Sequence, residues 1–121
     1  MKYLLLIYSD ENALSKSERE QCYSDSLDLA HQINSTGHYL AAAPLHPTST
    51  ATSVRVRDGK RFVTDGPFAE TREQLGGFFM IDAKDLDEAI AIAERLPMAL
   101  RGTIEVRPVV DLVGLPKPIC N

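Results

Sequence analysis

The chain contains no tryptophan, and only two cysteines and three histidines among its 121 residues. Cys22 and Cys120 lie too far apart to form a zinc-ligand motif, and the histidines have no metal-type spacing. No glycine-rich phosphate loop occurs either, because Gly76-Gly77 leads into a strand pattern and not into a helix. We therefore expect no metal and no other cofactor.

Disulfide chemistry is also not expected. Cys22 falls on the apolar side of a predicted helix, which favours a buried free thiol, and Cys120 is expected in a mobile terminal segment. Free thiols of this kind suit a reducing cytoplasm.

An excess of positive charge and a long apolar run are absent as well. The chain has 13 Lys and Arg against 17 Asp and Glu, a net charge of -4, which weighs against nucleic-acid binding. The apolar run Tyr3–Tyr8 is too short to cross a membrane, and polar residues follow it where a signal peptide would have a cleavage site. The composition, 44% hydrophobic and 25% charged, is that of one globular domain. We expect a cytoplasmic protein with a domain over residues 1–110 and a tail over 111–121.

Hydrophobic patterning predicts alternating strands and helices. The expected strands are 2–9, 39–45, 75–81 and 103–110, with a hairpin over 53–64. Asp58-Gly59 at the centre of the hairpin is a strong signal for a two-residue turn, because both positions need positive φ. We expect a short helical turn within Pro67–Gln74, capped by Thr71 with Gln74.

Two capping boxes predict where the helices begin. Ser17 with Glu20 matches the first, although Ser15 is an alternative cap, and Asp85 with Glu88 matches the second. Gly37 is placed to end the first helix, and the second must stop at or before Pro97. The residues expected on the apolar side of the helices are Cys22, Leu27, Leu29, Ala30 and Ile33 in the first, and Leu86, Ala89, Ile90, Ala93 and Leu96 in the second.

Without the hairpin, the order of elements is β-α-β-β-α-β. This order predicts an α+β, ferredoxin-like fold with both helices on one face of an antiparallel sheet and the hairpin inserted into it. The other sheet face would stay uncovered, and leucine-rich strands do not favour exposing both faces to water. We therefore predict a homodimer.

The densest group of unusual residues runs from Asp65-Gly66-Pro67-Phe68 to Gly76-Gly77-Phe78. This stretch resembles the signature of the DGPF family of YCII-related proteins. The likeness extends to the opening strand, to Thr50–Arg55 and to Ile104–Pro108. The resemblance implies a ferredoxin-like fold that assembles into a dimeric α/β barrel. It also implies that some relatives are linked to sigma factors, and that related proteins are suspected enzymes with a His-Asp pair, which here would join His46 or His38 to Asp65.

The candidate catalytic residues are Asp65 and His46. Asp65, fixed at a strand end by Gly66-Pro67, could act as a general acid or base if burial raises its pKa, or it could instead cap its own turn. His46 stands between Leu45 and Pro47, where an imidazole could project into a pocket.

Four further residues are candidates for substrate binding: Glu70, Arg72, Tyr8 and Phe68. Glu70 could be a second carboxylate of the same cleft, but an ion pair with Arg72 or with the arginines of the hairpin is the favoured interpretation. Arg72 could bind an anionic substrate through two hydrogen bonds, or it could only neutralise Glu70. Tyr8 and Phe68 could line an apolar pocket, or belong to the core or an interface.

Two hypotheses follow. The first is a small molecule bound in a cleft near Asp65-Gly66-Pro67-Phe68, where proton transfer without a metal is possible. The second is a non-catalytic ligand-binding or protein-interaction module linked to sigma-factor regulation.

Overall fold

The computed structural model describes residues 1–117, so Cys120 and the end of the predicted tail lie outside the described residues. Its elements are β1 (Lys2–Ser9), α1 (Lys16–Ser35), β2 (Tyr39–Pro44), the 3-10 turn η1 (Thr48–Thr50), β3 (Thr52–Arg57), β4 (Lys60–Asp65), β5 (Gln74–Asp82), α2 (Leu86–Ala93), the 3-10 turn η2 (Pro97–Leu100) and β6 (Thr103–Pro108). The last strand therefore ends two residues earlier than expected. The alternation of its side chains is confirmed, because Ile104 and Val106 pack against the core.

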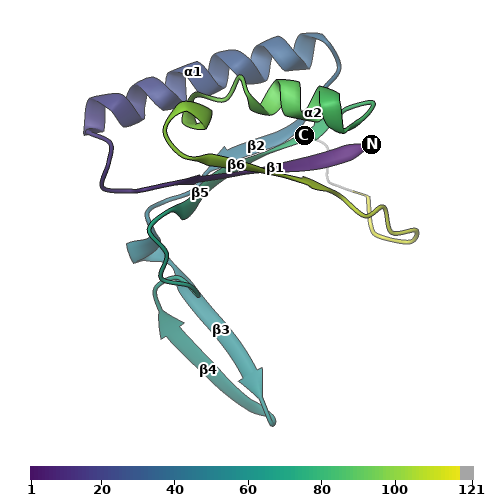
Figure 1. Ribbon diagram of the computed structural model, residues 1–121. Helices are drawn as coiled ribbons and strands as arrows, with labels where there is room; N and C mark the ends of the chain where they lie inside the picture. The colour runs from purple at the N-terminus through teal and green to yellow at the C-terminus, as the bar shows by residue number, and fades with distance from the viewer. Residues whose placement is uncertain (118–121) are drawn as a thin grey trace.

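The main sheet has four strands in the order β2-β5-β1-β6, and all its pairings are antiparallel. Both helices cover one face of this sheet, as Figure 1 shows. This arrangement is α+β and is compatible with the predicted ferredoxin-like fold. The β3–β4 hairpin forms a separate two-stranded sheet that projects from the uncovered side (Figure 1).

The core lies between the main sheet and the helices. Along β1, Tyr3 and Leu5 point toward the helices and are buried, and Leu4 and Leu6 point to the other face because side chains alternate along a strand. The residues that complete the core are Leu29, Ile33, Phe79, Ile81, Ala83, Ala89, Ile92, Ala93 and Leu96. The centre of the sheet is thus fully buried on one side alone.

Helix α1 begins at the alternative cap. The Ser15 hydroxyl accepts the backbone N–H of Glu18, and the Glu18 carboxylate accepts the backbone N–H of Ser15. The predicted box at Ser17 is therefore wrong by two residues, because both boxes fit the same sequence pattern. At the other end, the prediction for Gly37 is confirmed: it has φ 80°, and the next N–H, from His38, closes a Schellman motif on Ile33.

The predicted apolar faces were partly wrong. Leu27 is 62% exposed on α1, although Leu29 and Ile33 are buried and Cys22 is half-buried. Desolvation by this partial burial raises the pKa of the Cys22 thiol.

In α2, Leu86 and Ile90 are exposed, and the unexpected Ile92 is buried. This helix ends at Ala93, and residues 94–96 separate it from η2, so the helical spacing assumed up to Leu96 does not hold there.

The cap of α2 is confirmed at Asp85, whose carboxylate accepts the backbone N–H of Glu88. The reciprocal bond differs from the capping box, because Glu88 accepts the N–H of Lys84. No helical turn forms within Pro67–Gln74, so that prediction is wrong. There, Thr71 and Gln74 bond backbone carbonyls of their own loop, at Glu73 and Thr71 respectively, and cap no helix.

Candidate functional site

The arm, defined as Thr52–Asp65, has two chemically different faces. Its strands pair in the predicted register around Asp58 (φ 52°) and Gly59 (φ 72°), which confirms the two-residue turn. Opposite residues share a face. The valine face carries Thr52, Val54, Val56, Arg61, Val63 and Asp65, and the groove face carries Ser53, Arg55, Arg57, Lys60, Phe62 and Thr64.

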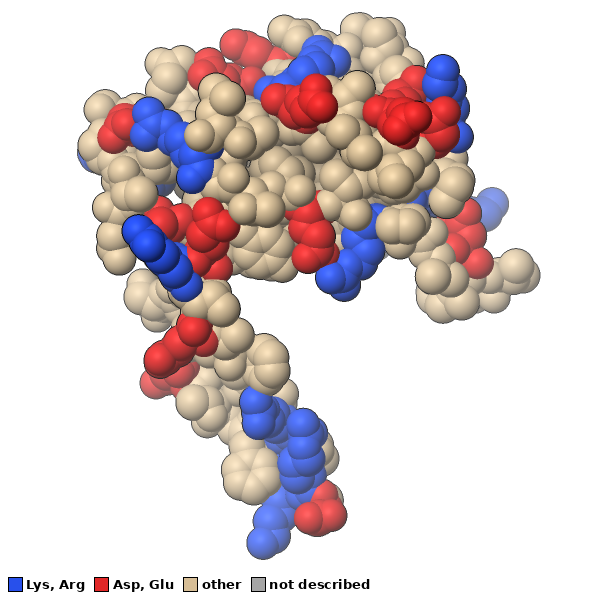
Figure 2. All heavy atoms as spheres, in the orientation of Figure 1, with Lys and Arg blue, Asp and Glu red and all other residues tan. Residues whose placement is uncertain are grey.

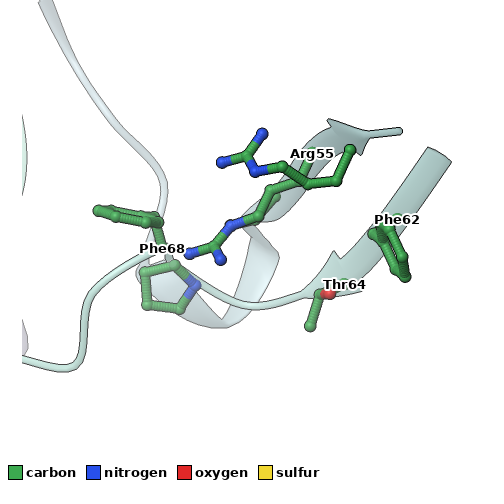
Figure 3. Close-up of a pocket in the computed structure, with 7 residues that line it drawn as sticks. Arg55, Phe62, Thr64 and Phe68 are labelled. Atoms are coloured by element: carbon green, nitrogen blue, oxygen red, sulfur yellow. The ribbon is translucent and has the colours of Figure 1, made fainter. Parts of the chain in front are cut away.

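The groove face borders a pocket of about 440 Å³, called here the arm groove. It is lined by Ser53, Arg55, Arg57, Phe62, Thr64, Pro67 and Phe68. Figure 3 shows Arg55 from β3, Phe62 and Thr64 from β4, and Phe68 from the loop that follows. The DGPF-like motif therefore contributes its last two residues to this groove.

Arg55 and Phe68, which both line the arm groove, contact each other. The guanidinium carbon of Arg55 lies 5.0 Å from the centroid of the Phe68 ring, which is the geometry of a cation–π contact. Phe68 is nevertheless 77% exposed, so most of the ring is available to another molecule. No carboxylate within residues 1–117 forms an ion pair with Arg55 or Arg57. The groove therefore combines unneutralised positive charge with accessible aromatic surface.

Asp65 is the last residue of β4 and pairs with Thr52 on the valine face. Its side chain is exposed and does not line the arm groove. Two hydrogen bonds of Gly66 hold the turn at Asp65: its N–H donates to the Ala51 carbonyl (2.7 Å), and its own carbonyl accepts the Ser53 hydroxyl (2.8 Å). Gly66 adopts φ 101°, a conformation that side chains disfavour, which explains the glycine in the motif.

His46 lies in the exposed loop after β2 and also does not line the groove. In the described part of the chain, no hydrogen bond joins Asp65 to His46 or to His38. Instead, His38 Nε2 lies 3.0 Å from a carboxylate oxygen of Glu88, and its Nδ1 lies 2.7 Å from the Thr36 hydroxyl. This pair connects the end of α1 to the start of α2, far from the motif in sequence.

Arg72 contacts Asp10, not Glu70. The distance from Arg72 Nε to the Asp10 carboxylate is 3.8 Å, and the Arg72 side chain is 91% exposed. Such an exposed pair contributes little to stability. Glu70 is exposed as well and makes no ion pair with any described residue. The expected Glu70–Arg72 pair is therefore not present.

Tyr8 is half-buried, lies on the uncovered face of the main sheet and does not line the arm groove. Register places it beside Thr103, in line with Leu6 beside Glu105 and Leu4 beside Arg107. We call this surface the open face; it comprises Leu4, Leu6, Tyr8, Phe78, Met80, Thr103, Glu105 and Arg107. Of the predicted site residues, the arm groove thus includes Phe68 alone.

The arm residues that line the groove are not among the predicted site residues. The sequence does contain a signal for them: a two-residue turn at Asp58-Gly59 fixes the register, and that register places Arg55 opposite Phe62 and Arg57 opposite Lys60. Two carboxylates that accept hydrogen bonds from distant segments are also not among the predicted residues. Glu11 accepts the N–H of Thr48 (3.0 Å) and its hydroxyl, and Glu73 accepts the hydroxyl of Thr103 (2.9 Å). Nothing local in the sequence identifies these long-range partners.

Within residues 1–117, no group of three or more His, Cys, Asp or Glu side chains is arranged to hold a metal ion. None of the helices in the described chain has both the length and the apolar character needed to cross a membrane.

These features define a class: a small α+β protein with one helix-covered antiparallel sheet and an inserted arm that borders a cationic, aromatic groove. The sequence matches the YCII-related domain over residues 1–113, and the chain belongs to this family. It is also similar to an uncharacterised protein of Rhizobium meliloti (strain 1021), with 42% identity over 113 residues, covering 89% of this chain and 91% of that protein.

Proposed function

We propose that this YCII-related protein binds a small organic anion with an apolar or aromatic body in the arm groove. One observation carries the proposal: Arg55 lies over the largely exposed Phe68 ring, and no carboxylate in the described chain neutralises its charge. A guanidinium group can bind a carboxylate through two parallel hydrogen bonds. Phe68 and Phe62 then provide apolar surface for the rest of the ligand.

Binding without proton transfer is the better-supported role. The lining of the arm groove, taken from the described residues, contains arginine, phenylalanine, proline and hydroxyl side chains but no carboxylate and no imidazole. General acid–base catalysis needs a titrating group within hydrogen-bond reach of the reacting atom. Asp65 lies on the opposite face of the arm, and His46 is in another loop. The groove therefore has the groups to hold an anion and lacks the groups to exchange protons with it.

Isothermal titration calorimetry with phenylacetate and its neutral analogue phenylacetamide tests this proposal. We expect heat of binding from the carboxylate and none from the amide, because the two probes differ in charge but not in ring size. Arg55→Gln should weaken phenylacetate binding by about 10- to 100-fold, since a hydrogen bond to a charged group contributes about 1.5–3 kcal/mol.

Two matched variants locate the binding site. Arg19→Gln removes an exposed arginine from α1 and should leave phenylacetate affinity unchanged. Asp65→Ala should also retain affinity, because that carboxylate does not face the groove. Equal loss in Arg55→Gln and Arg19→Gln would refute the site, and loss in Asp65→Ala alone would move the ligand to the other face of the arm.

We further propose that the protein is a homodimer whose copies pair through their open faces, as in a dimeric α/β barrel. The support is the face itself, where Leu4, Leu6, Phe78 and Met80 stand on the side of the sheet that no helix covers. Apolar surface of this kind gains free energy when it is removed from water. Sedimentation velocity should show a dimer at micromolar concentration, and a monomer there would refute this arrangement.

A further inference from the structure

The groove face of the arm carries two like charges opposite each other near its tip. Register places Arg57 directly across from Lys60, next to the turn and two residues along β3 from Arg55. We call Arg57 and Lys60 the tip pair. Like charges directly opposite each other on a sheet destabilise the strand pairing. The contact between Arg55 and Phe68, on which the proposed function rests, leaves this pair of cations without a role.

The described chain does not neutralise the tip pair. Within residues 1–117, neither Arg57 nor Lys60 forms an ion pair, although Asp58 is their neighbour in the turn. Arg57 donates a hydrogen bond from Nη1 to the carbonyl of Val56 (3.0 Å), and its guanidinium has further N–H donors. Both side chains are exposed, and Figure 2 shows basic groups gathered toward the tip of the arm. The tip pair is therefore accessible to an anionic group from outside the chain.

The spacing of the cations indicates the shape of such a ligand. Residues two apart in a strand share a face and lie about 7 Å apart along it, so Arg55 and the tip pair form two separate positive positions. Arg55 and Arg57 both line the arm groove, and Phe62 and Phe68 provide its apolar surface. A ligand with one anionic group reaches one of the two positions. A ligand with an anionic group at each end of an apolar body can reach both.

We propose that the arm groove binds an aromatic dicarboxylate, with one carboxylate on Arg55 and the other on the tip pair. This inference rests on the proposed anion-binding function and specifies its ligand class. The first carboxylate and the ring take the positions described for phenylacetate. The second carboxylate lies between Arg57 and Lys60 and removes their mutual repulsion, because it attracts both cations. The tip pair thus selects dianions over monoanions of the same shape.

Calorimetric titration with p-phenylenediacetate and p-tolylacetate tests the second position, because these probes differ only in a carboxylate or a hydrogen on one methyl carbon. The wild type should bind the dianion about tenfold more tightly, the lower end of what one more hydrogen bond to a charged group contributes, since the tip pair is exposed. Arg57→Gln should reduce this ratio toward about two, the value for two equivalent carboxylates that compete for Arg55 alone. Arg61→Gln removes the same charge from the valine face and should keep the wild-type ratio. Circular dichroism verifies that both variants keep the wild-type fold.

Phenyl phosphate, which carries its negative charge on one group, provides a second measurement and should bind more weakly than p-phenylenediacetate. Equal or tighter binding of phenyl phosphate would assign Arg55 and Arg57 to one compact site and overturn the second position. A wild-type ratio of about two or less, or equal loss of the ratio in Arg57→Gln and Arg61→Gln, overturns it as well. In each of these cases p-tolylacetate still binds, and the proposed function remains. Failure of every probe to bind refutes the proposed function and this inference together.

Discussion

The body and the arm show two different ways in which one chain uses apolar residues. In the body, apolar side chains of β1, β5 and the helices meet in a shared core, where Leu5, Ile33 and Ile81 are fully buried. In the arm, the valines are about as apolar as these core residues but stay about half exposed, because no other element of the described chain packs on the two-stranded sheet. The comparison indicates that the body is stabilised by the packing of its own core and that the arm is shaped by its turn and its strand pairing.

The largest expected effect comes from Leu5→Ala in the central strand. Removing a fully buried leucine costs about 2–5 kcal/mol of unfolding free energy through lost burial and the cavity left behind. Phe62→Ala, in the exposed arm, should change that free energy by less than about 0.5 kcal/mol. Urea denaturation followed by circular dichroism measures both. Equal losses would show that the arm and the body unfold as one cooperative unit.

A pair of glycines provides the second contrast. A Cβ at Gly102 would lie 2.1 Å from the carbonyl oxygen of Tyr8, so Gly102→Ala must displace the backbone of the main sheet, at a cost of about 1–3 kcal/mol. A Cβ at Gly59 meets nothing within 4 Å, but the residue has φ 72°. Gly59→Ala therefore strains the turn of the arm alone.

Amide exchange distinguishes the two glycine variants. Gly102→Ala should accelerate exchange throughout the main sheet, and Gly59→Ala should do so within β3 and β4 only. Acceleration of the main sheet by Gly59→Ala would contradict the separation of arm and body.

The smallest effect is expected at Glu88, which belongs to the body. The backbone N–H of Lys84 donates to its carboxylate and, with His38 nearby, lowers the pKa of Glu88 below its usual value. A carboxyl group with a lowered folded pKa adds stability above its unfolded pKa and loses it as the pH falls through the folded pKa. Glu88→Gln should therefore lower the melting temperature at pH 7, with the difference from wild type disappearing in acid. A difference independent of pH would exclude the charge as its cause.

Most of the fold could be predicted because its signals are local. The apolar run of β1, the Asp58-Gly59 turn and the glycine after α1 each specify their own backbone conformation. Local patterns predict less where two caps fit the same sequence pattern, as Ser15 and Ser17 do for α1. They also predict less in a short helix, since α2 buries Ile92 and leaves the predicted Ile90 exposed. In both places, tertiary packing selects among choices that the pattern leaves equal.

The candidate site was less predictable, because it depends on which face of a strand a residue occupies. Asp65 and Phe68 are three residues apart in one motif, yet Asp65 lies on the valine face and Phe68 borders the arm groove. A carboxylate such as Asp65 is a candidate catalytic group by its chemistry alone, whereas the face that the arm arginines occupy follows only from the register of the hairpin. The register of the hairpin determines which face each of these residues occupies, and the composition of the motif does not.

The arm begins and ends at the same place. Thr52 pairs directly with Asp65, and the hydrogen bond from the N–H of Gly66 to the carbonyl of Ala51 joins the two loops that flank the arm in a narrow neck. The arm can therefore be lengthened, shortened or exchanged without moving the two points at which it connects to the main sheet. Insertions or deletions within the arm are therefore expected to leave the four-stranded sheet and its helices unchanged.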